Sequence, residues 1–102
     1  MSLIKPTQPH DHSPTFKWTL TAGDEAEILP LPLGGQVILQ IDGDLAGGTV
    51  GVSGGLLREH LAIIKSFVHE GITTAPPVRF VLPEFTGAPD GATVTVIVAI
   101  AP

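Results

Sequence analysis

Residues 83–102, PEFTGAPDGATVTVIVAIAP, decide the fold of this chain. A Pro-Asp-Gly turn precedes residues 93–100, in which every side chain except Ala99 is β-branched. Such side chains are restricted at χ1 and pack well on a pleated sheet, so the segment predicts a strand. Its first half alternates threonine with valine and its second half is apolar on both faces, which indicates a central strand. One face must cover a core, and we expect the other to meet a further layer or a partner.

Two further strands are predicted near the beginning of the chain. Residues 15–20 alternate apolar with polar side chains, the period of a half-buried strand. Trp18 is the strongest candidate in this segment for an anchor of the core. Residues 27–31 predict a short strand at a sheet edge, because Pro30 and Pro32 lack the backbone N–H that a central strand needs.

Turn signals divide the rest of the chain into pairs of strands. Gly43-Asp44 and a Gly-Gly pair separate a strand at 36–42 from one at 49–53, which predicts a hairpin or meander. In the same way, the glycines and proline of 87–91 predict that a strand at 77–85 turns back antiparallel into the last strand.

The middle segment, residues 56–71, supports two interpretations. Leu57, Leu61, Ile64 and Val68 recur at helical spacing and a glycine follows where a helix would end, so a helix of about thirteen residues is the favoured prediction. The alternative is two short strands, at 60–64 and 66–68, because the isoleucines and other large apolar side chains of the segment favour sheet.

These elements predict one domain of mainly β class, an antiparallel β-sandwich of jelly-roll or related topology, with one short helix within 56–70 as an open alternative. We place the domain at 15–102. Residues 1–14 contain Pro6, Pro9 and Pro14 without apolar periodicity, so they predict an extended N-terminal arm, either loose or laid on a neighbour.

Composition excludes several classes of partner. The chain has 102 residues, 43% hydrophobic and 15% charged, with a net charge of -5 and only five scattered Lys and Arg. We therefore expect no binding to nucleic acid. No apolar run is long enough for a membrane helix or a classical signal peptide, so we expect neither membrane insertion nor export. The small charged fraction predicts that part of the exposed surface meets another protein.

Candidate ligand and catalytic residues do not form a complete site in the sequence. His10-Asp11-His12 offers ligands in the arm but lacks a firm additional one, and we leave open whether His10 and His12 bind a metal. His60 and His69 are expected to be ordinary surface histidines.

The acidic residues are interpreted as parts of solvated turns. Asp24, Glu25 and Glu27 cluster in one loop, and Asp42 and Asp44 lack the further ligands of a calcium loop. The prediction is therefore no metal site and no cofactor.

The segment Gly51-Val-Ser-Gly-Gly55 has the spacing of a nucleophile elbow around Ser53, but no Asp and His follow in the required order. We interpret it as a tight glycine turn. Because no nucleophile, base and orienting group can be assembled, we expect no catalytic residues and no enzyme activity.

The order of these segments resembles the small β-sandwich decoration or cement proteins of tailed-phage heads. A Trp-bearing strand with a Gly-Asp turn is followed by a strand with a glycine-rich hairpin, and an Arg-bearing strand is followed by a Thr- and Val-rich strand. The matching positions cover about two thirds of the chain and are Trp18, Gly23, Asp24, Gly43, Gly48, Val50, Arg79, Gly87 and Val94.

The resemblance implies a structural virion protein that binds the major capsid protein at capsomer junctions. It implies self-association, with a homotrimer expected, and a location on the exterior of a capsid after synthesis in the host cytoplasm. The alternative that we keep is a carbohydrate- or receptor-binding sandwich module of a phage tail or fibre, which would expose aromatic side chains for stacking.

Overall fold

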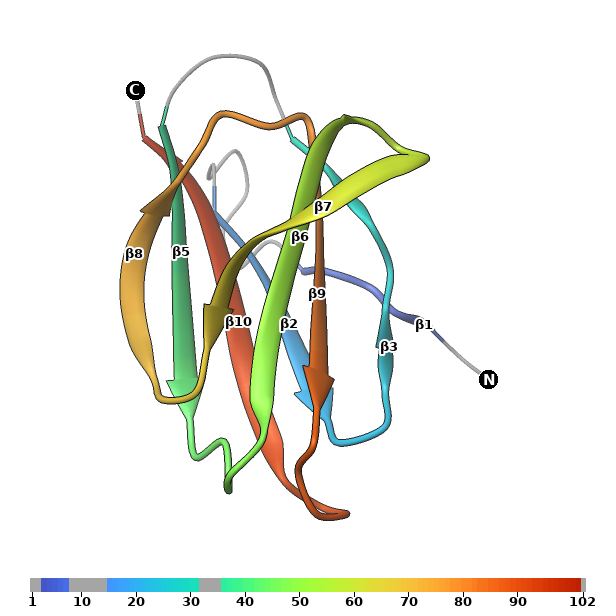
Figure 1. The fold of residues 1–102 in the computed structure, drawn as a ribbon, viewed down its shortest axis with the longest axis vertical. Helices are drawn as coiled ribbons and strands as arrows, with labels where there is room; N and C mark the ends of the chain where they lie inside the picture. The colour runs from blue at the N-terminus through green and yellow to red at the C-terminus, as the bar shows by residue number, and fades with distance from the viewer. Residues whose placement is uncertain (1–2, 8–14, 32–35, 102) are drawn as a thin grey trace.

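The computed structural model describes residues 3–7, 15–31 and 36–101. All of the secondary structure in these ranges is β, and most of it lies in two four-stranded sheets that face each other (Figure 1). The predicted class, a mainly β antiparallel sandwich, is therefore confirmed. The described residues contain no helix that is long and apolar enough to cross a membrane.

One sheet is built around the long strand predicted from residues 93–100, and we call it the β10 sheet. Every pairing in it is antiparallel, and β10 lies in its centre between β2 and β5. The predicted central position is thus correct. In spatial order the strands are β2 (Thr15–Thr21), β10 (Thr93–Ala101), β5 (Gln36–Gly43) and β8 (Gly71–Ala75).

The facing sheet, called the β6 sheet, is also antiparallel throughout. Its order is β4 (Leu29–Pro30), β9 (Phe80–Thr86), β6 (Thr49–Leu57) and β7 (His60–Phe67). Strand β4 is at the edge, as its prolines predicted. A small parallel pair, β1 (Leu3–Ile4) with β3 (Glu25–Ala26), completes the structure.

The path of the chain between the sheets is that of a jelly roll. Strands β2, β5, β8 and β10 belong to the β10 sheet, and β4, β6, β7 and β9 belong to the β6 sheet. From β2 onward the chain therefore changes sheet at every step except from β6 to β7. The two sheets have the spatial orders β2-β10-β5-β8 and β4-β9-β6-β7. This is the arrangement of a jelly roll, which consists of two Greek keys.

This path corrects two sequence predictions. The turns after β5 and after β9 do not make hairpins, because each carries the chain from one sheet to the other. Gly48 illustrates the tight packing of these turns: a Cβ added there would lie 2.7 Å from the carbonyl oxygen of Thr86 and 2.8 Å from the Cβ of Ala88. Two crossing loops thus pack on each other at one end of the sandwich.

The core lies between the sheets and is formed by alternate residues of β2, β5, β6, β9 and β10. Trp18 is fully buried, and its indole Nε1–H donates a hydrogen bond of 3.0 Å to the carbonyl oxygen of Glu27. Trp18, the only tryptophan, is therefore confirmed as an anchor of the core, because its ring is fully buried and its polar atom has a hydrogen-bond partner. The fully buried valine and isoleucine side chains of β10 and β5 include Val94, Val96, Val98 and Ile41.

The favoured helix in the middle segment was wrong. Residues 56–57 end β6 and residues 60–67 form β7, so the two predicted short strands are one continuous strand. Two positions of the helical stripe, Leu57 and Val68, are 57% and 60% exposed and take no part in the core. The tight glycine turn at 51–55 was also wrong, because β6 runs through this segment as an extended strand.

The described part of the predicted N-terminal arm lies on the chain's own sheets. Besides the β1–β3 pair, the backbone N–H and C=O of Thr7 both bond to Lys17 of β2, at 2.7 and 2.8 Å respectively. The remaining arm positions, with His10 and His12, lie outside the described residues.

Candidate interaction surface

Exposed apolar side chains are concentrated in one segment. Six large hydrophobic side chains are exposed in the described ranges, and all except Leu3 lie between residues 56 and 72. We call this group the 56–72 strip; it consists of Leu56, Leu57, Ile63, Val68 and Ile72, which are 57–68% exposed. The segment runs from the β6–β7 turn across the front of the molecule and then along its side as β8 (Figure 1).

Glycines in β6 allow β7 to lie close to it. The pairing of the two strands shifts register between Val52 and Ser53 and again between Gly54 and Leu57. A Cβ added to Gly55 would clash with the backbone carbonyl oxygen of His60, and one added to Gly54 would lie 2.9 Å from the Cδ1 of Ile64. The bulges place Ile64 against the core and leave its neighbour Ile63 68% exposed on the outer face.

The outer face of the β6 sheet has low relief in its centre, because two of the outward residues of β6 are glycines. Ser53 pairs with Leu82 of β9 and with Ile63 of β7. The residues two positions away on the same face, Gly51 and Gly55, lack side chains. The flat central strand is therefore flanked by apolar side chains beside Ser53 and by the polar residues Glu84 and Ser66 beside Gly51.

An arginine covers the upper part of this face. Phe80 of β9 pairs with Gly55, and the Cζ atom of Arg58 lies 5.5 Å from the centroid of the Phe80 ring. A guanidinium at this distance is attracted to the face of the ring. Arg58 comes from the turn between β6 and β7, so the cation–π contact ties that turn to β9.

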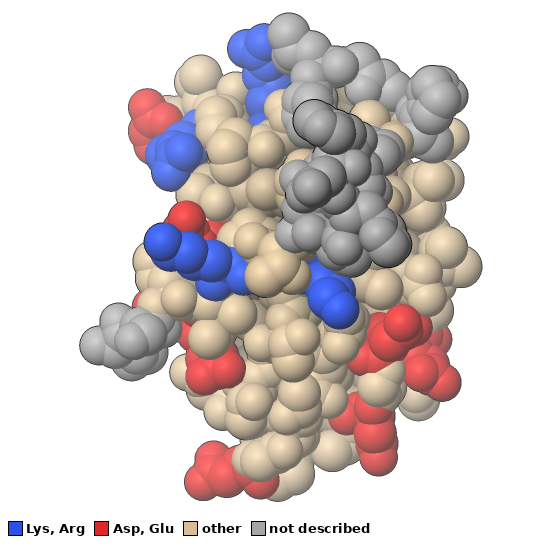
Figure 2. All heavy atoms as spheres, turned by 180° about the vertical axis from the view of Figure 1, so that it is seen from behind, with Lys and Arg blue, Asp and Glu red and all other residues tan. Residues whose placement is uncertain are grey.

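The outer face of the β10 sheet is different in character. Threonines of β2 and β10 pair across it, with the hydroxyl oxygens of Thr21 and Thr93 3.2 Å apart. Towards β8, Ile97 and Gln40 pair with one another and Gln40 pairs with Ile72. Figure 2, which shows this side of the molecule, is mostly uncharged apart from scattered basic and acidic side chains.

The lower end of the sandwich is acidic. The loops at 22–24, 44–48, 68–70 and 87–92 contain four acids, Asp24, Asp44, Glu70 and Asp90, and no Lys or Arg. In Figure 2 this end carries red side chains and no blue ones. The turns at the opposite end carry Arg58 and Arg79 together with Glu59, so the two ends of the molecule differ in charge.

An open cavity of 660 Å³ lies at the acidic end, between residues 43–47 and 68–70. Its carboxylates bond within the chain: Glu70 accepts from the backbone N–H of Gly43 at 3.3 Å, and Asp44 accepts from that of Ala46 at 2.8 Å. Asp42, just outside, accepts from the side-chain amide of Gln40 at 3.0 Å. Of the acids predicted to lie in turns, Asp44 does so, whereas Asp42 belongs to β5.

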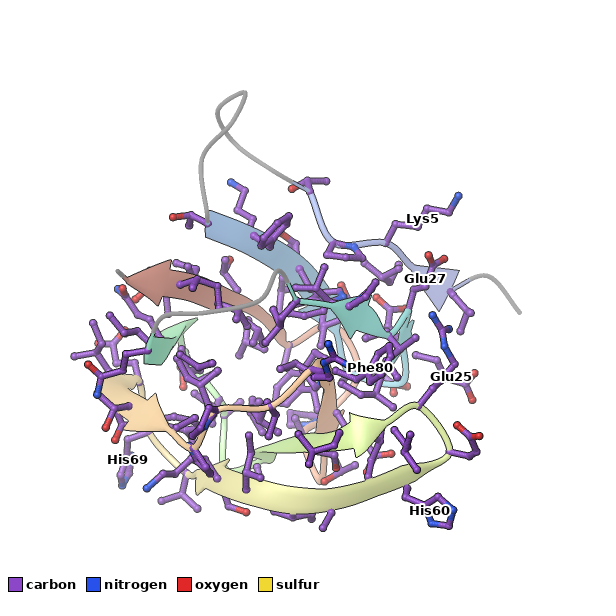
Figure 3. The ribbon with its side chains drawn as sticks, turned by 90° about the horizontal axis from the view of Figure 1, so that it is seen from above. Lys5, Glu25, Glu27, His60, His69 and Phe80 are labelled. Carbon is purple, nitrogen blue, oxygen red and sulfur yellow. The ribbon has the colours of Figure 1, made fainter. Side chains whose placement is uncertain are left out.

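The other candidate residues are dispersed over the molecule. His60 and His69 lie at opposite ends of the β7 region, at the tip of the β6–β7 turn and at the acidic end (Figure 3). Asp24 accepts a hydrogen bond of 2.9 Å from the backbone N–H of Thr21, which closes the turn before β3. Ser53 lies in the middle of a strand. Within 3–7, 15–31 and 36–101, no three His, Asp or Glu side chains gather as metal ligands.

Sequence reasoning missed the 56–72 strip in part because two of its residues, Leu57 and Val68, were assigned to the apolar face of a predicted helix. The low charge of the chain did indicate an exposed apolar surface, but not where it lies. Comparison with protein-family models, curated proteins and solved structures finds no match to this chain.

Proposed function

We propose that this chain is a structural virion protein that decorates an assembled phage capsid by binding the major capsid protein at capsomer junctions. The observation that carries the proposal is the 56–72 strip, because its exposed apolar side chains, at the β6–β7 turn and on the outer faces of both sheets, are suited to docking on other proteins. The sequence resemblance and the occurrence of jelly rolls among viral capsid domains support the same role.

The proposed role is mechanical and involves no catalysis. A protein that binds only the assembled shell stabilises that shell by mass action, and each bound copy adds to the effect. Copies that also contact one another gain from effective concentration, so weak individual contacts become a firm lattice. Self-association belongs to the proposal, with a homotrimer as the arrangement expected from the sequence, and the place of action is the exterior of the virion.

Co-sedimentation with phage heads tests the proposal. A major-capsid gene beside the coding gene identifies the heads to use, and heads lacking the chain are mixed with purified protein and pelleted. We expect saturable binding in proportion to the number of capsomer junctions. A chain that stays in the supernatant at all concentrations would contradict the capsid role.

A double substitution locates the docking surface. Leu56→Ser/Leu57→Ser removes two side chains that are 64% and 57% exposed, so the fold should persist while head binding weakens by about tenfold or more. Leu3→Ser is the matched control, since it removes a leucine that is 49% exposed in β1 and outside the strip. Equal binding by both variants would exclude the β6–β7 turn from the docking surface.

One observation favours the alternative, a carbohydrate- or receptor-binding module. The open cavity at the acidic end brings Asp44, His69 and Glu70 beside the apolar side chain of Val68, a mixture that could hold a polar ligand. Screening immobilised glycans with the purified chain tests it. Binding that is lost with His69→Ala and kept with His60→Ala would favour the alternative over the capsid role.

A further inference from the structure

The four outermost strands of the two sheets differ in how well their free edges are protected. An unprotected edge presents unpaired backbone N–H and C=O groups that can pair with a strand of another molecule. Proteins usually block such edges with prolines, bulges, inward-pointing charges or covering segments. The edge strands here are β2, β4, β7 and β8.

Three of the edges carry such a device. The edge of β2 is covered at Lys17, whose backbone N–H and C=O both bond to Thr7. Strand β4 has only two residues, and one of them is Pro30. Strand β7 is distorted by its register shifts, and Lys65 pairs with the buried Val52, a position that faces the interior.

Among the residues that the structure describes, the edge of β8 carries none of them. Its five residues, Gly71-Ile-Thr-Thr-Ala75, include no charge and no proline, and they pair with β5 in a register without shifts. Ile72 and Thr74 are exposed on the outer face, with Ile72 at 67%. Figure 1 shows β8 at the outer side of the molecule, with no strand beyond it.

We propose that β8 pairs antiparallel with β8 of a second copy, so that two β10 sheets join into one continuous sheet across a two-fold axis. The other three edges each carry a protecting device, so the bare edge of one copy finds its complement in the same edge of another. A two-fold contact uses the same surface on both partners.

The register of this pairing follows from the faces of the strand. Thr73 faces Thr73 of the second copy, because only this arrangement pairs all five residues and keeps inward side chains opposite inward ones. Ile72 then lies opposite Thr74 of the other copy on the outer face. The antiparallel direction also places Glu70 of each copy beside the neutral Pro76 end of the other, so the two carboxylates stay apart.

The inference rests on the self-association in the proposed function, but its test does not need a capsid. The pair links two copies, whether these stand alone or belong to neighbouring trimers. Sedimentation velocity of the full chain from about 10 to 300 μM should therefore show dimers or other even-numbered species. Monomers only, or trimers only, over this range would overturn the inference.

Charge substitutions on β8 test the register. Ile72→Lys/Thr74→Lys places like charges opposite each other twice across the two-fold axis, whereas Ile72→Lys/Thr74→Glu places opposite charges there. Both variants change the same two exposed positions, so the folded monomer should tolerate them equally. We expect the first to associate at least about tenfold more weakly than the second at low salt. Equal association of the two variants would overturn the pairing.

A crosslinking experiment gives an independent readout. The chain contains no cysteine, so Thr73→Cys introduces a single thiol, and oxidation should yield a disulfide-linked dimer because position 73 faces itself. Thr74→Cys is the matched control, since position 74 faces position 72 and the two thiols lie on a diagonal. Equal crosslinking of both variants, or none by Thr73→Cys, would contradict the register even if one charge variant failed to fold.

Discussion

Replacing the buried Ile41 by alanine should cost much more stability than the same change at Ile63. Ile41 lies in β5 between β10 and β8 with no exposed surface, whereas Ile63 of β7 is 68% exposed. Ile41→Ala removes about three buried methylene equivalents, worth roughly 2–2.5 kcal/mol at ~0.8 kcal/mol each. The cavity left between the sheets raises the expected loss to about 3–4 kcal/mol.

Urea denaturation measures this difference. With a slope of about 1–3 kcal/mol per molar urea, the midpoint of Ile41→Ala should fall by roughly 1–4 M, while that of Ile63→Ala should stay within about 0.5 M of the parent. Because Ile63 belongs to the 56–72 strip, the curves should be recorded at two protein concentrations to separate folding from association. Similar losses at the two positions would refute the assignment of Ile63 to an outer face and of β5 to the core.

Three further predictions concern single contacts. Gly48→Ala should destabilise the fold by about 1–3 kcal/mol, because the added Cβ would meet Thr86 and Ala88 where β9 leads into the next loop. Gly71→Ala has open space around it and should be neutral or slightly stabilising. Urea denaturation measures both changes in stability. The emission of Trp18 should be that of a buried indole, resist acrylamide quenching and shift to the red on unfolding; strong quenching in the native state would contradict its burial. Asp24→Ala should lower the free energy of unfolding by about 0.5–1.5 kcal/mol, because it removes the acceptor of the Thr21 backbone N–H. Asp90→Ala, at an exposed position, should lower it less, and thermal unfolding followed by circular dichroism compares the two variants. Equal losses would argue against the hydrogen bond that closes the Asp24 turn.

The strands with the clearest local signal were predicted correctly. β-Branched residues placed β10 in the centre of a sheet, alternation around Trp18 identified β2, and Pro30 identified an edge strand. In each case the signal depends only on neighbouring residues: side-chain shape, the period of two, or a missing backbone donor. The β-sandwich class followed from these local signals.

The segment around β7 was mispredicted because its structure depends on contacts outside itself. The spacing of Leu57, Leu61, Ile64 and Val68 fits one face of a helix, but bulges opposite β6 let Ile64 reach the core while Leu57 and Val68 remain exposed. A bulge adds a residue to one strand of a pair, so it breaks the period of two on which strand prediction relies. Sequence periodicity alone could not reveal it.

The connections were mispredicted for a different reason. The Gly-Asp turn after β5 and the Pro-Asp-Gly turn after β9 have the composition of hairpin turns, and composition predicts that the chain reverses. It does not predict whether the returning strand joins the same sheet or the opposite one. The unprotected edge of β8 could not be predicted for the same reason, because an edge strand can be recognised only when the neighbours of every strand are known.

The place of β10 in its sheet has a consequence for the way the chain folds during synthesis. Its partners β2 and β5 leave the ribosome well before residues 93–101, so the gap that β10 fills stays open until translation of this segment is complete. Pairing of residues so far apart is slow, and the waiting strands expose apolar surface meanwhile. The nascent chain should therefore bind general chaperones up to that moment, and ribosome-stalled chains lacking residues 93–101 should remain sensitive to protease.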